Sequence, residues 1–278
     1  MDLDPDDHRI REPIAEGVFY PADAETLESE IRGRLQNSPV IADHSRAVVV
    51  PYASYSYAGT HLASAFKSAA ARPISRVLLI GPCHRDPGPG VYVPESSGFR
   101  IPTGVVTVDS ATVATAVECG AIRDDMPHLD EHSLEVQLPF VHYLYPRARI
   151  VPLLTGGATA RHSKLLATIL AGMAPALGPG DLLVVAANVS GSLDRIDARR
   201  EAGIVINTVL ECRFEALSAA VDDGDVTAAG AGCIAAALRY VECSEGWEIL
   251  SQGDSYSVDG DPSNCVEYAA IALGRDNE

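Results

Sequence analysis

The stretch that decides the fold is "RAVVVPYASYSYAGTHLASAF", residues 46–66. Four apolar residues, 47–50, end at Pro51, and a run that alternates tyrosine with small residues precedes a helix-like segment from Gly59. This order predicts a buried strand, a loop and a helix, and α/β folds bind ligands at the carboxyl ends of such strands. The loop offers phenol and hydroxyl groups to a ligand: Tyr52, Ser54, Tyr55 and Tyr57.

The same alternation continues along the chain of 278 residues. Short apolar runs predict strands at 47–50, 77–80, 150–154, 182–186, 248–251 and 266–271. Patterns with helical periodicity predict helices at 25–35, 60–70, 110–119, 133–144, 161–174, 198–219 and 233–243. Strands that alternate with helices indicate a mostly parallel central sheet flanked by helices. No linker is evident, so we expect a single α/β domain over 1–278, with residues 1–10 as a flexible N-terminal segment.

Composition and charge exclude several classes of partner. The formal net charge of -17 argues against nucleic acid and anionic membranes, because phosphate contacts need clustered Lys and Arg. No apolar run approaches the roughly 20 residues of a membrane helix, and the acidic start "MDLDPDDHRI" is not a signal peptide. We therefore expect a cytoplasmic protein. The six cysteines form no C-x-x-C pair, which predicts reduced thiols, neither a disulfide framework nor a zinc site.

Polar side chains follow the second predicted strand. "RVLLIG" runs into "PCHRD", which places Cys83, His84 and Arg85 just past a strand end, at the same edge as Tyr52. Histidine in such a position is common in active sites. A polar loop in which His84 only satisfies backbone groups explains the residues equally well.

A third cluster is "DEHSLEVQLPF", residues 130–140. Asp130 is placed to cap a helix, and Glu135 in the first turn favours the helix dipole. The functional interpretation is that His132 is an acid/base residue held at a helix terminus. Spacing alone does not separate a capping cluster from a catalytic one.

A fourth cluster follows the strand in "DLLVVAANVSGSL", where Asn188, Ser190 and Ser192 surround Gly191. An ordinary turn explains these residues as well as a ligand site does. Cys233 lies in the small-residue stretch "AAGAGCIAAAL" and is expected in the core, not as a nucleophile.

Together these pieces resemble the Memo family, also called AmmeMemoRadiSam system protein B. The resemblance rests on blocks spread over nearly the whole chain: "GVFYPAD" (17–23), "VPYASYSYAG" (50–59), "LLIGPCH" (78–84), "FRIPTGVVTVD" (99–109), "DEHSLEVQLPF" (130–140), "VVAANVSG" (184–191) and "DPSNCVEYAAIAL" (261–273). It implies the α/β fold that this family shares with the class III extradiol (LigB-type) dioxygenases.

The resemblance also implies a degenerate metal site. Family members that hold a metal carry a histidine where this chain has Tyr52, and their second histidine matches His84. Their aspartate falls on Asn188, a nearby histidine on Gly191, and their cysteine on Ala229. Only His84 survives of these polar positions. A mononuclear metal centre needs about three protein ligands, so the resemblance implies neither a bound metal nor a cofactor, and not a standard extradiol dioxygenase.

The residues that remain predict a polar pocket suited to a small polar metabolite. We expect a metal-independent enzyme that uses acid/base chemistry, in specialised biosynthesis and in complex with a partner protein. The predicted catalytic residues are His132, His84 and Tyr52. The predicted substrate-binding residues are Asn188, Ser54, Tyr55, Cys83, Arg85 and Glu135.

Two alternatives remain open from the sequence. The chain can be a catalytically dead scaffold that stabilises or completes a partner enzyme, which the loss of ligands favours and the surviving histidines oppose. It can also be a metal-dependent enzyme with atypical ligands, for which Cys83 or Cys233 are candidates. The expected partners of the protein are a small polar metabolite and a second protein chain, either another protein or a copy of this one.

Overall fold

The structure is a computed structural model that describes residues 9–40, 44–85, 88–156, 159–174, 178–241 and 246–273. Its centre is an eight-stranded sheet in the order β10-β11-β2-β9-β3-β8-β4-β7. The strands are β2 (Ala47–Val50), β3 (Arg76–Cys83), β4 (Gly90–Val93), β7 (Ile122–Arg123), β8 (Arg149–Gly156), β9 (Asp181–Ala186), β10 (Trp247–Asp254) and β11 (Glu267–Leu273).

Strands β2, β9, β3 and β8 run parallel to one another and form the middle of this sheet. The flanking strands make it mixed, because β11 is antiparallel to β2 and β10, and β4 is antiparallel to β8. A second, three-stranded sheet joins β1 (Ile10–Arg11), β5 (Gly98–Ile101) and β6 (Gly104–Thr107). The mostly parallel sheet expected from the sequence is thus present in the four central strands.

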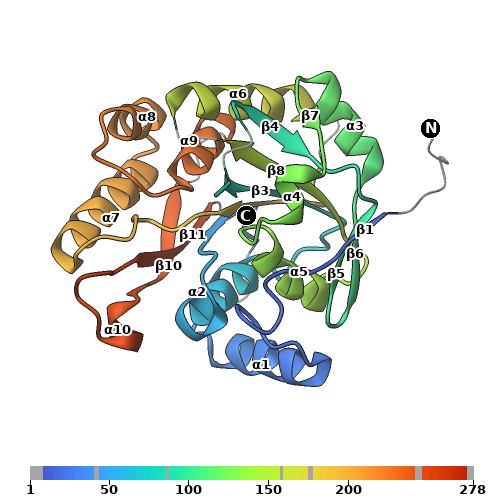
Figure 1. Cartoon of the computed structure of the whole chain (residues 1–278), viewed down its shortest axis with the longest axis horizontal. Helices are drawn as coiled ribbons and strands as arrows, with labels where there is room; N and C mark the ends of the chain where they lie inside the picture. The colour runs from blue at the N-terminus through green and yellow to red at the C-terminus, as the bar shows by residue number, and fades with distance from the viewer. Residues whose placement is uncertain are drawn as a thin grey trace.

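Helices cover both faces of the large sheet (Figure 1). The helices α1 (Ala24–Asn37), α2 (Tyr55–Ser68) and α5 (Leu138–Leu144) pack together on one face. The other face is covered by α3 (Ser110–Glu118), α6 (Ala160–Met173) and α9 (Ala231–Tyr240), with α8 (Phe214–Asp222) packed on α6 and α9. The remaining helical segments are α4 (Met126–Leu129), the 3-10 helix η1 (Glu135–Gln137), α7 (Arg195–Leu210) and α10 (Tyr256–Asp259). This three-layer arrangement is the α/β fold that the alternating pattern predicts.

Local chemistry accounts for these elements. All four residues of β2, "AVVV", are buried, which suits a β-branched central strand covered on both faces. Helix α1 begins at Asp23, whose side chain accepts a hydrogen bond from the Thr26 backbone N–H, and α7 begins at Asp194 in the same way. The six predicted strands are confirmed, each lying in an observed strand or overlapping one.

One predicted helix is divided in the structure. The region expected as a single helix over 198–219 forms α7 and α8, because Cys212 between them has a φ of 55° and a left-handed residue ends an α-helix. Cys212 is also disulfide-bonded, which corrects the expectation of reduced thiols throughout. Four other cysteines, Cys83, Cys119, Cys233 and Cys265, are free.

Two helices near the site begin at positions that differ from the prediction. Helix α2 starts at Tyr55 instead of residue 60, so Tyr55 and Tyr57 are helical and the loop after β2 is short. The helix expected from Ser133 starts as the 3-10 turn η1 and becomes α-helical only at Leu138, where Pro139 occupies the first turn. Residues 130–134 are therefore not helical.

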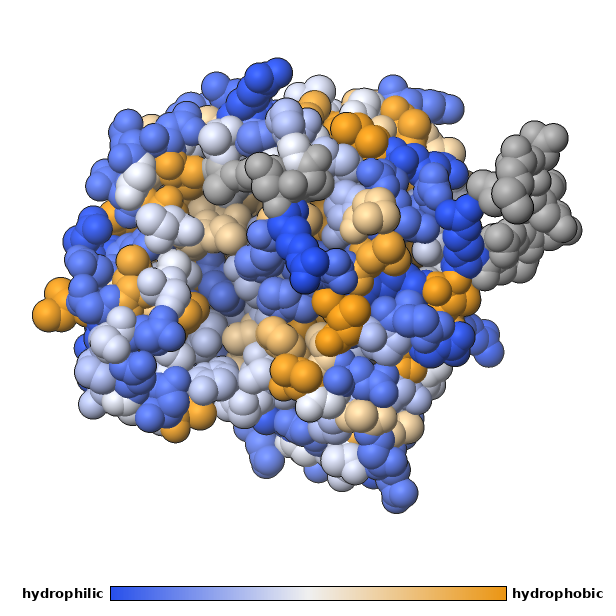
Figure 2. Space-filling model, in the orientation of Figure 1, coloured by the Kyte–Doolittle hydropathy of each residue, from blue (hydrophilic) through white to orange (hydrophobic). Residues whose placement is uncertain are grey.

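The start of the chain and the surface complete the description. Residues 1–8 of the segment expected to be flexible lie outside the described residues, while Ile10 pairs with Gly98 in the smaller sheet. On the face shown in Figure 2 hydrophilic residues dominate, and hydrophobic ones form small separate groups. Among the described helices, none combines the length and the apolar character needed to cross a membrane.

Candidate functional site

Three neighbouring parallel strands deliver polar side chains to one edge of the large sheet. Tyr52 follows β2, Asn188 follows β9, and His84 follows β3. The backbone N–H of Tyr52 donates to Oδ1 of Asn188 at 3.3 Å, which joins the first two strand ends directly. The carboxyl edge of parallel strands is where α/β proteins bind ligands.

The segment 130–134 brings His132 to this edge, and a buried ion pair fixes the segment in place. Arg11 of β1 contacts the carboxylate of Glu135, donates from Nε to the His128 carbonyl at 3.0 Å, and donates from Nη2 to the Glu131 carbonyl at 2.8 Å. The side chains of Arg11 and Glu135 are each 1% exposed. Strand β1 thus holds the main chain on both sides of Glu131.

Glu131 organises the two histidines. Its Oε2 accepts the His84 backbone N–H at 2.6 Å, and its Oε1 lies 3.0 Å from Nδ1 of His84 and 3.4 Å from Nδ1 of His132. Oε1 also accepts the Ser133 backbone N–H at 2.8 Å. An ionised carboxylate only accepts hydrogen bonds, so we assign a hydrogen to Nδ1 of each imidazole. The Nε2 atom of each ring then faces away from Glu131.

Tyr52 contacts both rings. Its hydroxyl lies 3.3 Å from Nε2 of His84, and its ring meets the two imidazoles edge-on, with centroid distances of 5.2 and 5.8 Å. The imidazoles of His84 and His132 stack with centroids 4.8 Å apart. The ring of Phe19 contacts His132 at a centroid distance of 4.6 Å. With His84 36% and His132 24% exposed in their side chains, the pair is open to solvent.

The pKa values of Glu131, His132 and Tyr52 are shifted in different directions. Burial acts to raise the pKa of Glu131. The side-chain hydrogen bond and the charge interaction with His84 oppose burial, as do the hydrogen bonds from the backbone N–H groups of His84 and Ser133, and together they lower the pKa to about 2. Burial lowers the pKa of His132, which favours its neutral form at cellular pH. Burial, followed by the charge of Glu131, raises the pKa of Tyr52, so its phenol keeps its proton.

The predicted site residues divide into those that the structure brings together and those that it does not. Tyr52, His84, His132 and Asn188 converge as expected. At the margin, Cys83 donates to the Arg85 carbonyl at 2.9 Å, and the exposed Arg85 pairs with Asp130 at 2.7 Å. This pairing replaces the helix-capping role expected for Asp130. Ser54 precedes α2, where its hydroxyl lies 2.8 Å from that of Ser56.

Two residues expected to bind substrate have their polar atoms engaged in the interior. Glu135 accepts from the Ala15 backbone N–H at 2.8 Å and from the Tyr20 hydroxyl at 2.6 Å, besides its ion pair with Arg11. Tyr55 is 2% exposed and donates its hydroxyl to the Val136 carbonyl at 3.0 Å. Their contacts are structural, and we withdraw the substrate-binding role for both.

Sequence reasoning missed Glu131 and Phe19. Glu131 stands beside His132 in "DEH", but neighbouring residues of a helix point apart, and the segment was expected to lead straight into one. The proline at 139 was the available signal that the helix begins later. Phe19 lies in the "GVFYPAD" block, and its distance of more than a hundred residues from His132 left no local signal.

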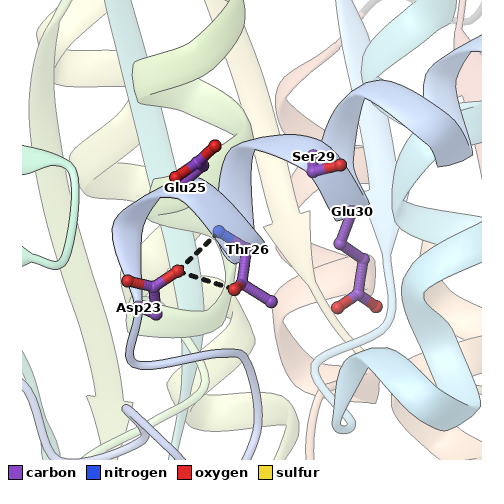
Figure 3. Close-up of a pocket in the computed structure, with 5 residues that line it drawn as sticks. All are labelled: Asp23, Glu25, Thr26, Ser29 and Glu30. Carbon is purple, nitrogen blue, oxygen red and sulfur yellow. Dashed lines mark hydrogen bonds between the residues drawn. The ribbon is translucent and has the colours of Figure 1, made fainter.

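A surface hollow of about 510 Å³ lies elsewhere, at the start of α1 (Figure 3). Its lining is acidic or hydroxylic: Asp23, Glu25, Thr26, Ser29 and Glu30. Asp23 accepts from the backbone N–H and the hydroxyl of Thr26, at 2.8 and 2.6 Å, which is ordinary helix capping. The hollow therefore adds no chemistry to that of the histidine cluster.

Comparisons with known proteins identify the family of this chain. The family model described as Memo-like protein matches residues 11–272. The chain belongs to the Memo family. A MEMO1 family protein from Methanopyrus kandleri is 29% identical over 281 residues, covering 95% of this chain and 99% of the relative. One from Ignicoccus hospitalis is 30% identical over 280 residues, covering 94% and 98%.

A solved structure supports the fold alone. The crystal structure of an uncharacterized protein from Escherichia coli K12 matches with a TM-score of 0.54 and 14% sequence identity. The match covers 82% of this chain and 99% of that one. The Memo assignment therefore fixes the family and the architecture, and the chemistry has to be argued from the residues themselves.

The metal positions implied by the Memo resemblance do not fit a metal in this chain. Tyr52 has a raised pKa and stays a neutral phenol, a poor ligand, and Asn188 already accepts from the Tyr52 backbone. A Cβ atom at Gly191 would lie 2.3 Å from Oγ1 of Thr227, so a side chain there needs local rearrangement. His84 alone does not make a mononuclear centre.

A second donor set is His84, Glu131 and His132, whose ligand atoms lie within 4.8 Å of one another. A carboxylate has about four lone-pair sites. Four nitrogens already contact those of Glu131: the backbone N–H groups of His84 and Ser133 and the Nδ1 atoms of the two histidines. The set is therefore better described as one carboxylate that contacts two stacked imidazoles than as a metal centre.

Proposed function

We propose that this protein is a metal-independent Memo-like enzyme that carries out acid/base chemistry on a small polar metabolite. The observation that supports the proposal is that one buried carboxylate, Glu131, engages Nδ1 of two imidazoles and turns their Nε2 atoms away from it. A scaffold gains nothing from two histidines aligned in this way at an open edge of the sheet.

In this proposal His132 is the general base. Its lowered pKa keeps the imidazole neutral at cellular pH, and Nδ1 carries the hydrogen that faces Glu131. The lone pair of Nε2 then accepts a proton from the substrate. When the proton arrives, the charge of Glu131, 3.4 Å from Nδ1, stabilises the imidazolium.

Tyr52 and His84 supply the complementary acid. The raised pKa of Tyr52 keeps its proton on the phenol, and the hydroxyl is oriented by Nε2 of His84 at 3.3 Å. The phenol has a single hydrogen, so it donates to Nε2 of His84 in the free protein and, when substrate is bound, turns to a substrate oxygen that develops negative charge. Glu131 and His84 thus hold the Tyr52 hydroxyl in place at the sheet edge, and Asn188 fixes the backbone of Tyr52.

The substrate class follows from the surroundings. The rings of Phe19 and Tyr52 contact His132, and the polar groups are a phenol, imidazoles and an amide. These groups suit a small molecule with hydroxyl or carbonyl oxygens. The formal charge of -17 and the scarcity of lysine do not favour highly anionic substrates.

The test compares the wild-type protein with His132→Gln in extracts of small metabolites, with and without candidate partner proteins. Mass spectrometry should show a metabolite consumed by the wild type and by His142→Gln but not by His132→Gln. His142 is a suitable control because it lies near the end of α5, beside Gly104. If the wild type and His132→Gln change the same metabolites at the same rates, the site is vestigial and the scaffold alternative holds. If turnover requires added metal, the atypical metalloenzyme replaces this proposal.

A further inference from the structure

A second group of metal-ligating side chains lies apart from the histidine pair, where β10 and β11 meet α7. It consists of Asp254, Cys265 and Glu267, whose ligand atoms lie within 4.8 Å of one another and which are all buried. Asp254, at the end of β10, is directly opposite Glu267, at the start of β11. Cys265 is two residues before Glu267, so the two side chains point to the same face of the extended chain.

The pairing of Asp254 and Glu267 is unfavourable without a cation between them. Two carboxylates directly opposite each other on antiparallel strands repel, and both side chains here are only 6% exposed. Two arginines of α7 partly offset this repulsion. Arg199 donates from Nη2 to Asp254 Oδ2 at 3.3 Å and lies 3.5 Å from Glu267 Oε1, and Arg195 lies 3.5 Å from Asp254 Oδ2.

These arginines leave an acceptor of the cluster unsatisfied. Among the residues that the structure describes, Glu267 Oε1 accepts no hydrogen bond although its side chain is 94% buried, and Arg195 Nε donates none. Buried polar atoms without partners are rare in folded proteins and point to a missing group. The arginine side chains are 32% and 57% exposed, so they can shift toward solvent and leave the carboxylates to another cation.

The donor types define which cation. One thiol and two carboxylates give a mixed set of soft and hard ligands, which suits zinc better than magnesium or calcium, because those ions take oxygen ligands. Zinc that is bound by three protein ligands takes water in the fourth position. Asp254 is already oriented for this, since its Oδ1 accepts from the Ser257 backbone N–H at 2.9 Å, which leaves Oδ2 toward the cluster.

We propose that Asp254, Cys265 and Glu267 form a zinc site, completed by water, that fastens β10 and β11 to the chain after β9. Cys265 exchanges two backbone hydrogen bonds with Leu193, and the Glu267 backbone N–H donates to Ser190 Oγ at 2.9 Å. The bound ion therefore stiffens the segment that follows Asn188. The cysteine spacing gave no sign of such a site, because a single thiol acts with carboxylates on a neighbouring strand.

Cobalt(II) provides a direct probe, because a cobalt–thiolate bond produces a charge-transfer absorption in the near ultraviolet. The full-length protein is stripped with a chelator and titrated with cobalt(II), and then with zinc(II) in competition. We expect one equivalent of cobalt with the charge-transfer band, displaced by one equivalent of zinc, and a higher melting temperature in zinc. Cys265→Ser should abolish the band, and Glu267→Gln should weaken binding at least about tenfold.

Matched controls locate the signal. Cys119→Ser, at the end of α3, and His84→Gln should both retain the band. The wild-type protein without a charge-transfer band, or Cys265→Ser with an undiminished band, would overturn the proposal. If Cys265→Ser does not fold, Glu267→Gln is the deciding variant, because it replaces a single carboxylate oxygen of the cluster. An unchanged affinity of this variant for cobalt would also overturn the proposal. The readouts do not depend on catalysis, so they are independent of the function proposed for the histidine pair.

Discussion

Replacing Glu131 with glutamine tests whether this carboxylate organises the candidate site. In the folded protein its pKa falls from 4.5 to about 2, since its contacts with His84 and with backbone N–H groups outweigh burial. Each pKa unit corresponds to about 1.4 kcal/mol. The ionised form therefore contributes about 3 kcal/mol to the free energy of unfolding at neutral pH.

The sign of the pH dependence follows from the direction of the pKa change. A carboxylate with a depressed folded-state pKa stabilises the protein fully above its unfolded pKa, near 4.5, and the contribution disappears as the pH falls toward 2. At pH 3.5 about 1.4 kcal/mol of it is already lost. Glu131→Gln does not titrate in this range. Its amide has one acceptor oxygen, so it cannot replace both oxygens of the carboxylate.

The assay is urea unfolding of the wild type and Glu131→Gln from pH 7 to pH 3.5. The difference in unfolding free energy should be about 3 kcal/mol at pH 7 and shrink to about 2 kcal/mol at pH 3.5. Glu12→Gln is the control, because Glu12 is an exposed carboxylate paired with Arg100, and such pairs are worth about 1 kcal/mol or less. A difference that stays constant over this pH range would refute the role assigned to Glu131.

Three further predictions follow from the site and its support. His132→Gln should leave the melting temperature nearly unchanged and lower turnover of the identified metabolite by about a hundred- to ten-thousand-fold. The acid limb of the wild-type kcat/KM profile should lie below pH 6.5, because burial lowers the pKa of His132. A stability loss without a rate loss would instead indicate a structural histidine. Gly191→His should not create a metal site and should lower the free energy of unfolding by about 1–3 kcal/mol, since a Cβ atom there meets Thr227 Oγ1 at 2.3 Å. Stoichiometric iron or copper in this variant would show that these positions can hold a metal. Glu135→Gln should lower the unfolding free energy by about 3–5 kcal/mol by leaving the buried Arg11 unpaired, and a loss below 1 kcal/mol in denaturant unfolding would show that water replaces the carboxylate.

The sequence predicted the central strands well because their signal is local. A run such as 47–50 is apolar and β-branched and has no other stable place than a buried strand, and the residue that follows it necessarily lies at the sheet edge. Tyr52, His84 and Asn188 were found for this reason. The short strands β1, β4, β5, β6 and β7 were not predicted, since two to four residues carry too little periodicity.

The role of Glu135 could not be predicted from its neighbours in the chain. A glutamate in the first turn of a helix is usually a favourable charge near the helix dipole. Here its partner is Arg11, which lies in the smaller sheet and far away in sequence, and no local pattern indicates such a contact. The same limit applies to the contact between the rings of Phe19 and His132.

The contact between Arg11 and Glu135 spans 124 positions of the chain. Closing so large a loop costs conformational entropy before any contact repays it, and contacts of this kind slow folding. The segment that carries Glu131 and His132 is anchored at its backbone by that arginine. The histidine pair should therefore become ordered together with β1, and a folding chain in which α5 has already packed would still lack an organised site until β1 has docked.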